Sequence, residues 1–165
     1  MLRCKRKKHD VYLGLGSNLG DRGENLKNAI KHINERIGDV ISISAFYVTE
    51  PVGFDSQNQF LNAAIHVRAR LSPATVLSVS QEIEQEMGRH TKSVAGVHTD
   101  RIIDIDLLLY DDLIFRSDEL TLPHPHLHER DFVLMPLSEI AAEYKHPLLG
   151  KTIEELKELY MKSNP

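Results

Sequence analysis

The sequence predicts an α+β domain in which an antiparallel sheet carries two helices on one face. Three observations favour this fold class. The chain has 165 residues, which is enough for one domain with its own apolar core. Segments with apolar residues at every second position alternate with segments in which they recur at helical spacing. Their order is strand, helix, strand, strand, helix, strand, so we expect a single domain at residues 11–165 after a basic tail at residues 1–10.

The first half of this pattern begins with a strand near residue 11. Its apolar residues alternate along the chain and share one side: Val11, Leu13 and Leu15. A helix follows at about residues 22–37, with Asp21 as its N-cap and Gly38 as its stop. Its apolar residues lie on one stripe: Leu26, Ala29, Ile30, Ile33 and Ile37. A second strand is predicted at residues 40–49.

The second half begins with the clearest strand, at residues 60–69. One of its sides is apolar and consists of Leu61, Ala63, Ile65, Val67 and Ala69. The next helix starts at Ser72-Pro73, an N-cap followed by proline, and ends before Gly88. Its predicted buried stripe consists of Val76, Leu77, Val79, Ile83 and Met87, which leaves Gln81 and Glu84 on its exposed side or at the edge.

The last strand of the pattern is predicted at residues 101–110. Its apolar residues point one way and are Ile103, Ile105, Leu107 and Leu109, while Asp104 and Asp106 point the other way. The whole order matches the ferredoxin-like βαββαβ pattern with both helices on one face. The opposite face would carry Tyr12, Asn62 and the two aspartates and would be open to a ligand. C-terminal additions follow: a short strand at 113–115 and helices at about 128–140 and 152–160.

Composition narrows the function classes. A net charge of −4 and an isoelectric point near 6.1 argue against nucleic-acid binding by bulk electrostatics. The single cysteine, Cys4, excludes a disulfide framework and favours the cytoplasm. No apolar run reaches the 18 residues of a membrane span, so we expect no membrane partner. The basic tail is interpreted as a solvated end, with contact to a nucleotide or lipid as the alternative.

Asp104 and Asp106 are the strongest chemical signal. Their Cα atoms are about 7 Å apart on one strand face, and such carboxylates repel one another unless a cation lies between them. A cationic run at residues 89–99 precedes them, and a histidine-rich segment follows. Carboxylates that recruit Mg²⁺, together with cationic donors, are typical of a polyphosphate site. Plain solvation of an exposed strand is the alternative for an Asp-x-Asp pair taken alone.

Two other motifs invite functional interpretations that we weigh less. Gly14-Leu15-Gly16 follows a strand, but Leu19 occupies the place of the third glycine of a dinucleotide fingerprint. His124, His126 and His128 suggest zinc, yet two prolines stiffen that segment and no ordinary zinc-site spacing recurs nearby.

Four segments, in order, resemble the 6-hydroxymethyl-7,8-dihydropterin pyrophosphokinase family. They are Tyr-Leu-Gly-Leu-Gly-Ser-Asn-Leu-Gly-Asp-Arg at 12–22, Thr-Glu-Pro-Val-Gly at 49–53 with Phe-Leu-Asn-Ala-Ala at 60–64, Arg-Ile-Ile-Asp-Ile-Asp at 101–106, and Leu-Pro-His at 122–124 with Arg-Asp-Phe-Val-Leu at 130–134. The resemblance implies a transferase of folate biosynthesis that moves pyrophosphate from MgATP to the pterin hydroxymethyl group and releases AMP. It also implies a monomer, with a dimer as the alternative.

The resemblance carries site roles over to matching positions. The implied catalytic residues are Arg89, Arg101, Asp104 and Asp106, and the two aspartates would hold two Mg²⁺ ions. The implied ATP contacts are Gln81, Glu84, Lys92, His98, Thr121, His124 and Arg130. The implied pterin pocket consists of Thr49, Glu50, Val52, Phe60, Asn62 and Phe132, with the bicycle stacked between the two phenylalanines and its edge read by the Asn62 amide.

The chain departs from the family pattern at several places: the end of the catalytic loop, the slightly longer interval from Arg89 to Arg101, and Pro125, where some members have tyrosine. Many members end the catalytic loop with Trp-Gly-Pro-Arg, whereas this chain has His98-Thr99-Asp100-Arg101 and no tryptophan at all. Two other functions remain as alternatives: a metal-dependent phosphohydrolase that uses the histidine run, and a nucleotide-binding module without catalysis.

Overall fold

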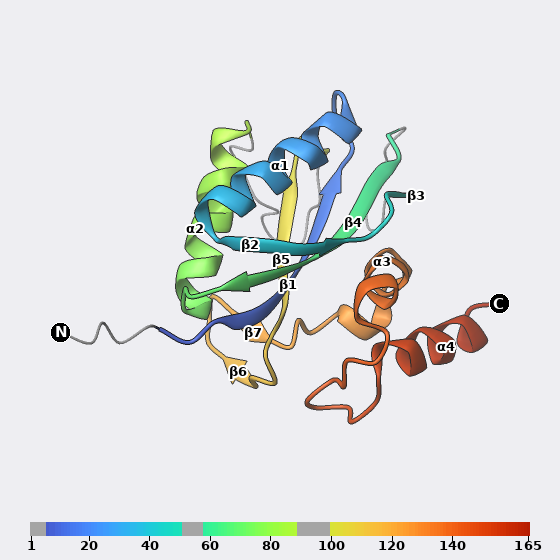
Figure 1. Ribbon diagram of the computed structural model, residues 1–165. Helices are drawn as coiled ribbons and strands as arrows, with labels where there is room; N and C mark the ends of the chain where they lie inside the picture. Colours follow the sequence, from blue (N-terminus) through green and yellow to red (C-terminus); the bar gives the residue numbers. More distant parts are fainter. Residues whose placement is uncertain (1–5, 51–57, 89–99) are drawn as a thin grey trace.

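The sheet has the predicted ferredoxin-like arrangement (Figure 1). The computed structural model describes residues 6–50, 58–88 and 100–165. Four antiparallel strands lie in the order β2-β4-β1-β5, and a short β3 also pairs with β4. The strands are β1 His9–Ser17, β2 Gly38–Ile43, β3 Tyr47–Thr49, β4 Phe60–Ala69 and β5 Asp104–Tyr110. The bounds of β4 are those predicted from its alternation.

Helices α1 and α2 cover one face of this sheet, as predicted (Figure 1). Helix α1 spans Arg22–Arg36, and its N-cap Asp21 accepts a hydrogen bond from the Glu24 amide at 3.1 Å. Helix α2 spans Pro73–Glu86 and begins after the N-cap Ser72. The largest fully buried side chains of this first core are Leu13, Leu26, Ile33, Ile65, Ile83, Ile103 and Leu122.

The opposite face of the sheet carries a second core, which the sequence analysis did not predict. A 3₁₀ turn at Leu127–Glu129 leads into α3 Asp131–Ala141, and α4 Ile153–Ser163 packs beside α3. The main buried side chains of this core are Tyr12, Ala64, Leu108, Leu127, Leu134, Leu137, Ile153 and Leu156. The face predicted to be open is therefore covered along part of its length and open only along the rest.

The strand predicted at residues 40–49 is divided. The chain leaves the ladder at Ala45 and Phe46, because the Ala45 amide donates to the Glu139 carboxylate of α3 at 3.0 Å rather than to a neighbouring strand. The short strand predicted at 113–115 is observed as β6 Phe115–Arg116, which pairs with β7 Thr121–Leu122.

Strand β5 also differs from the prediction in two respects. It begins at Asp104, three residues later than expected. Its pairing with β1 shifts by one residue, since Leu13 faces Leu107 while Tyr12 faces Leu109. Such a bulge reverses the alternation beyond it. Leu109 therefore joins the second core rather than the first, as does Leu108, and the prediction for Leu109 was wrong.

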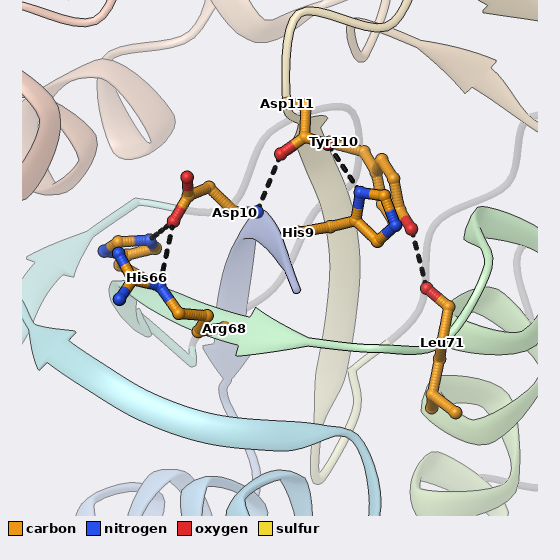
Figure 2. Close-up of polar contacts among 7 residues, drawn as sticks. All are labelled: His9, Asp10, His66, Arg68, Leu71, Tyr110 and Asp111. Atoms are coloured by element: carbon orange, nitrogen blue, oxygen red, sulfur yellow. Dashed lines mark hydrogen bonds and ion pairs between the residues drawn. The ribbon is translucent and has the colours of Figure 1, made fainter. Parts of the chain in front are cut away.

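Polar contacts fasten the start of β1 to the end of β5 (Figure 2). Strand β1 starts at His9, and Asp111 accepts from the Asp10 amide at 2.8 Å and lies 2.6 Å from His9 Nδ1. The Asp10 carboxylate lies 2.8 Å from His66 Nε2 of β4. These contacts join three strands at the end of the sheet remote from Asp104. None of the helices in the described residues has the length and apolar character needed to cross a bilayer.

Candidate active site

Two glycines of the central strand form the floor of the site. Gly16 of β1 lies between Asn62 of β4 and Asp104 of β5, and Gly14 lies beside Asp106. A Cβ atom at Gly16 would come within 2.9 Å of the Asn62 side-chain oxygen. Since neither glycine has a side chain, the aspartates on one strand and the amide on the other face the same open space.

That space is a cavity that is open to solvent. Most of the predicted site residues that the structure describes line it: Thr49, Glu50, Phe60, Asn62, Arg101, Asp104, Asp106, Arg130 and Phe132. Segments far apart in the sequence thus contribute to one cavity, with β5 on one side, β3 and β4 on the other, and the start of α3 at the end.

The other predicted ATP contacts lie outside this lining. Gln81 is half-buried on α2, and Thr121 belongs to β7. Glu84 is 1% exposed, so the expectation that it lies on the exposed side of the helix was wrong. Its position on α2, one residue after the fully buried Ile83, turns it inward with the apolar stripe. Four predicted residues fall outside the described residues: Val52, Arg89, Lys92 and His98.

An ion pair forms the acidic side of the cavity. The Arg101 guanidinium lies 3.1 Å from an Asp104 carboxylate oxygen, and these side chains are 9% and 21% exposed. Partial burial strengthens this attraction relative to a surface pair. The positive charge of Arg101 also offsets the repulsion between Asp104 and Asp106 on this strand face.

The carboxylate pair also meets the requirements of Mg²⁺. Both aspartates offer hard oxygen donors to the cavity. In the part of the chain that the structure describes, no group of three or more histidine, cysteine or acidic side chains could enclose a metal. Mg²⁺ is commonly held by one or two protein carboxylates, with phosphate oxygens and water completing its octahedron. The donor set therefore fits a magnesium ion that arrives with a phosphorylated substrate.

Two aromatic rings line the other side of the cavity, and each lies next to an arginine. The Arg101 guanidinium carbon is 5.9 Å from the centre of the Phe60 ring, and that of Arg130 is 5.5 Å from the centre of the Phe132 ring. Cations within about 6 Å of a ring face are attracted to it. The geometry places groups suited to anions directly beside groups suited to a flat aromatic ligand.

Asn62 is held in a defined orientation. It is 6% exposed, and its amide nitrogen donates to the Thr49 hydroxyl across the β3–β4 pair. Because this bond fixes the plane of the amide, Asn62 presents a directed polar edge to the cavity. An amide combines a donor and an acceptor, which is the pattern that a heterocycle edge can pair with.

His124 is neutral at pH 7. Burial, together with the charge of the nearby Arg130, lowers the pKa of His124 to about 4. Its Nδ1 accepts from the His126 amide at 3.2 Å, which leaves the ring proton on Nε2. His124 can thus donate a hydrogen bond without adding a charge. The exposed His126 pairs with Glu129 at 2.9 Å, and the half-buried His128 lies 3.6 Å from the same carboxylate.

Comparison with known proteins places the chain in a family. The family model described as 7,8-dihydro-6-hydroxymethylpterin-pyrophosphokinase matches residues 12–142. The chain belongs to this family. The resemblance inferred from the sequence motifs is therefore confirmed, and so is the α+β fold.

Two bacterial pyrophosphokinases illustrate the similarity. The 2-amino-4-hydroxy-6-hydroxymethyldihydropteridine pyrophosphokinase of Porphyromonas gingivalis is 49% identical over 138 residues, which cover 83% of this chain and 93% of the relative. The enzyme of the same name from Aquifex aeolicus is 40% identical over 147 residues, or 89% of each chain.

A solved structure agrees with the fold. Wild-type HPPK-DHPS of Plasmodium falciparum with pteroate superposes with a TM-score of 0.77 at 18% identity. The match covers 97% of this chain and 46% of the longer one, so the chain spans less than half of that protein.

Several lining residues of this pyrophosphokinase were missed by sequence reasoning. They are Gly14, Leu15, Gly16, Ala63, Ala64, Leu108, Val133 and Pro136. The glycines had a signal, because Gly14 and Gly16 occupy alternate positions on the strand face opposite Leu13 and Leu15. Their spacing was compared only with a dinucleotide fingerprint. The space that two glycines leave open on one face of a sheet was not considered. Val133 and Pro136 gave no signal that separates them from ordinary helix core.

Proposed function

We propose that this cavity is where the chain, an ATP-dependent diphosphokinase of folate biosynthesis, transfers pyrophosphate from ATP to the hydroxymethyl oxygen of 6-hydroxymethyl-7,8-dihydropterin. One observation carries the assignment: the carboxylates of β5 and the Asn62–Phe60 side of β4 face one cavity across a glycine floor. A reaction between a polyanion and a flat heterocycle requires this juxtaposition.

The pterin side consists of Phe60, Phe132 and the Asn62–Thr49 pair. The two rings bind the bicycle by its faces, which is an efficient use of aromatic area. Asn62, held by Thr49, pairs with the polar edge of the heterocycle. Because this contact fixes the rotation of the bicycle in its plane, it directs the hydroxymethyl group toward Asp104 and Asp106.

The phosphate side consists of Arg101, Arg130, Asp104 and Asp106, with His124 as a neutral donor at its margin. Arginine suits phosphate oxygens because its planar fork can bond two of them at once. Two Mg²⁺ ions held by Asp104 and Asp106 would supply Lewis-acid stabilisation of the charge on the polyphosphate. Arg101 lies between the carboxylates and the Phe60 ring, so it can bind the transferred group on the side nearest the pterin.

The reaction forms one bond and breaks another. The hydroxymethyl oxygen bonds to the β-phosphorus and loses its proton to solvent, the bond from that phosphorus to the oxygen bridging to the α-phosphate breaks, and AMP leaves with that oxygen and its electron pair. The residues of the chain orient the oxygen, hold the phosphates in line with it and compensate the charge on the bridging oxygen. We further propose that residues 11–165 act as one catalytic domain and that the enzyme is a cytoplasmic monomer.

A turnover assay tests this function. With MgATP and 6-hydroxymethyl-7,8-dihydropterin, we expect one AMP for each pterin diphosphate formed and no AMP without pterin. Release of ADP or free phosphate would instead support the phosphohydrolase. The double variant His126→Ala, His128→Ala separates the two functions further. Both imidazoles pair with Glu129 and neither lines the cavity, so the transferase should retain its turnover.

Glu139 fastens the pterin side of the site. Its carboxylate accepts from the Ala45 amide at 3.0 Å and from the Tyr47 hydroxyl, and this second bond raises the pKa of Tyr47. Tyr47 lies on β3 with Thr49, while Glu139 lies on α3 with Phe132. The bond therefore holds the two elements that flank the pterin pocket at a fixed separation.

Tyr47→Phe should weaken the contact between β3 and α3, because it removes the hydroxyl that donates to Glu139. We expect the KM for the pterin to rise about 3- to 10-fold, since a hydrogen bond to a charged group is lost, while kcat stays within about 2-fold. Steady-state kinetics with varied pterin measures both constants. The control is Tyr160→Phe on α4, which should leave the KM unchanged. A fall in kcat without a change in KM would contradict this role.

A further inference from the structure

Asn18 holds the backbone of Arg101 on both sides. It follows β1 directly and is 3% exposed. Its side-chain oxygen accepts a hydrogen bond from the Arg101 amide at 2.7 Å, and its own backbone amide donates to the Arg101 carbonyl at 3.0 Å. A single residue thus binds both backbone polar groups of Arg101, although the two are 83 positions apart in the sequence.

The same side chain reaches the residue before Arg101. The Asn18 amide nitrogen donates to one Asp100 carboxylate oxygen at 2.7 Å, and the other Asp100 oxygen accepts from the Asn58 amide nitrogen at 3.0 Å. Asp100 stands where the family pattern has proline, so this contact belongs to the particular sequence of this chain. Together these contacts join the residue that follows β1 to the segment that precedes β5. They also join it to Asn58, two residues before β4.

Arg101 depends on such contacts because it is outside the sheet. Strand β5 begins at Asp104, so no ladder pairing fixes the backbone at position 101. Its guanidinium nevertheless lies 3.1 Å from the Asp104 carboxylate and 5.9 Å from the centre of the Phe60 ring. Asn18 is not among the residues that line the catalytic cavity, whereas Arg101 is. We therefore expect Asn18 to act on the reaction through the residues that it holds.

We propose that Asn18 is a positioning residue that sets the place of the Arg101 guanidinium during pyrophosphoryl transfer. This inference rests on the proposed function of the cavity. Misplacement of a catalytic group by about 1 Å can cost roughly 10²-fold in rate. The loss should fall on kcat, because the Arg101 guanidinium pairs with Asp104, one of the carboxylates that handle the transferred group.

The first experiment compares Asn18 with Asn25 of α1, whose side chain bonds to residues on either side of Asn18. Asn18→Ala should lower kcat by roughly 10²-fold, with KM values for ATP and pterin within about 3-fold of those of the wild type. Asn25→Ala is the matched control, because the Asn25 side chain donates to the Ser17 hydroxyl at 3.1 Å and to the Leu19 carbonyl at 2.8 Å and no hydrogen bond of the described residues joins it to Arg101. An equal loss of kcat in both variants would overturn the proposal, since it would reflect damage to the turn.

A double-mutant cycle tests whether Asn18 acts through Arg101. In an Arg101→Ala background, Asn18→Ala should lower kcat by less than about a further 3-fold, because the guanidinium that Asn18 positions is absent. Equal losses in the two backgrounds would overturn the proposal, and so would full activity of Arg101→Ala alone. A wild-type enzyme that releases no AMP would instead contradict the proposed function itself, which separates the two failures.

A double variant that exchanges the side chains of Asn18 and Asp100 provides a test by rescue of kcat. Asn18→Asp alone places two carboxylates at hydrogen-bond distance and should lower kcat. Asn18→Asp with Asp100→Asn restores a donor and an acceptor: position 18 still accepts from the Arg101 amide and now also accepts from position 100. We expect the double variant to recover at least about 10-fold of the lost kcat. A double variant no better than Asn18→Asp would count against the positioning role.

Discussion

Alanine in place of Asp106 is expected to lower the rate of AMP release by at least about 10³-fold. Asp106 lies beside Gly14 on the cavity floor and provides one of the two carboxylates that fit Mg²⁺. The Arg101–Asp104 pair stays intact in this variant, so the loss isolates the metal-binding role of one carboxylate. Asp104→Ala should be at least as severe, because it also removes the partner of Arg101.

The control removes a carboxylate from the other end of the same strand. Asp111 follows β5 and holds the start of β1 (Figure 2), at the opposite end of β5 from Asp104. Asp111→Asn keeps an acceptor for the Asp10 amide and should retain kcat within about 2-fold. Initial rates should be measured over a wide range of Mg²⁺ concentration. Turnover by Asp106→Ala within 10-fold of the wild type at all these concentrations would contradict the assignment of this carboxylate.

The elements predicted best are those whose environment is uniform along their length. Strand β4 has one face on the first core from end to end, and its bounds match its alternation. Helix α1 has the predicted start because Asp21 supplies a local cap. Both signals are contained within a short window of sequence, so no knowledge of distant contacts was required.

The elements predicted poorly depend on distant partners. The bulge that moves Leu109 to the second core arises from the register of β1 with β5, and no residue of β5 by itself indicates it. The break after Ile43 depends on Glu139, which is 94 positions away from Ala45. The second core likewise requires that α3 and α4 pack against the sheet, which periodicity within each helix does not specify.

The candidate site shows the same division. Asp104 and Asp106 could be found from their alternation on one strand, and the motifs around them indicated the ligands. Asn18 could not be assigned a role, because its partner Arg101 lies 83 positions away and the bonds are to backbone groups. The sequence therefore identifies chemical groups better than it identifies the residues that hold them in place.

The two cores lead to a prediction that separates stability from substrate binding. Leu26 of α1 belongs to the first core and Leu134 of α3 belongs to the second, and both side chains are fully buried. Truncation of a buried leucine to alanine costs about 3 kcal/mol of unfolding free energy, because it removes apolar contacts and leaves a cavity. We therefore expect both Leu26→Ala and Leu134→Ala to be destabilised by similar amounts in urea denaturation.

Their effects on pterin binding should differ, because α3 carries residues of the cavity lining whereas α1 carries none. Helix α3 carries Phe132, Val133 and Pro136 into the lining, and Leu134 anchors that turn of the helix to the sheet. Leu134→Ala should raise the KM for the pterin by about 10-fold, since the Phe132 ring loses its fixed distance from Phe60. Leu26→Ala should leave this constant within about 2-fold at a temperature where both variants are folded. Equal KM values in the two variants would mean that the pocket is held by β3 and β4 alone, and that the second core supports the sheet without shaping the site.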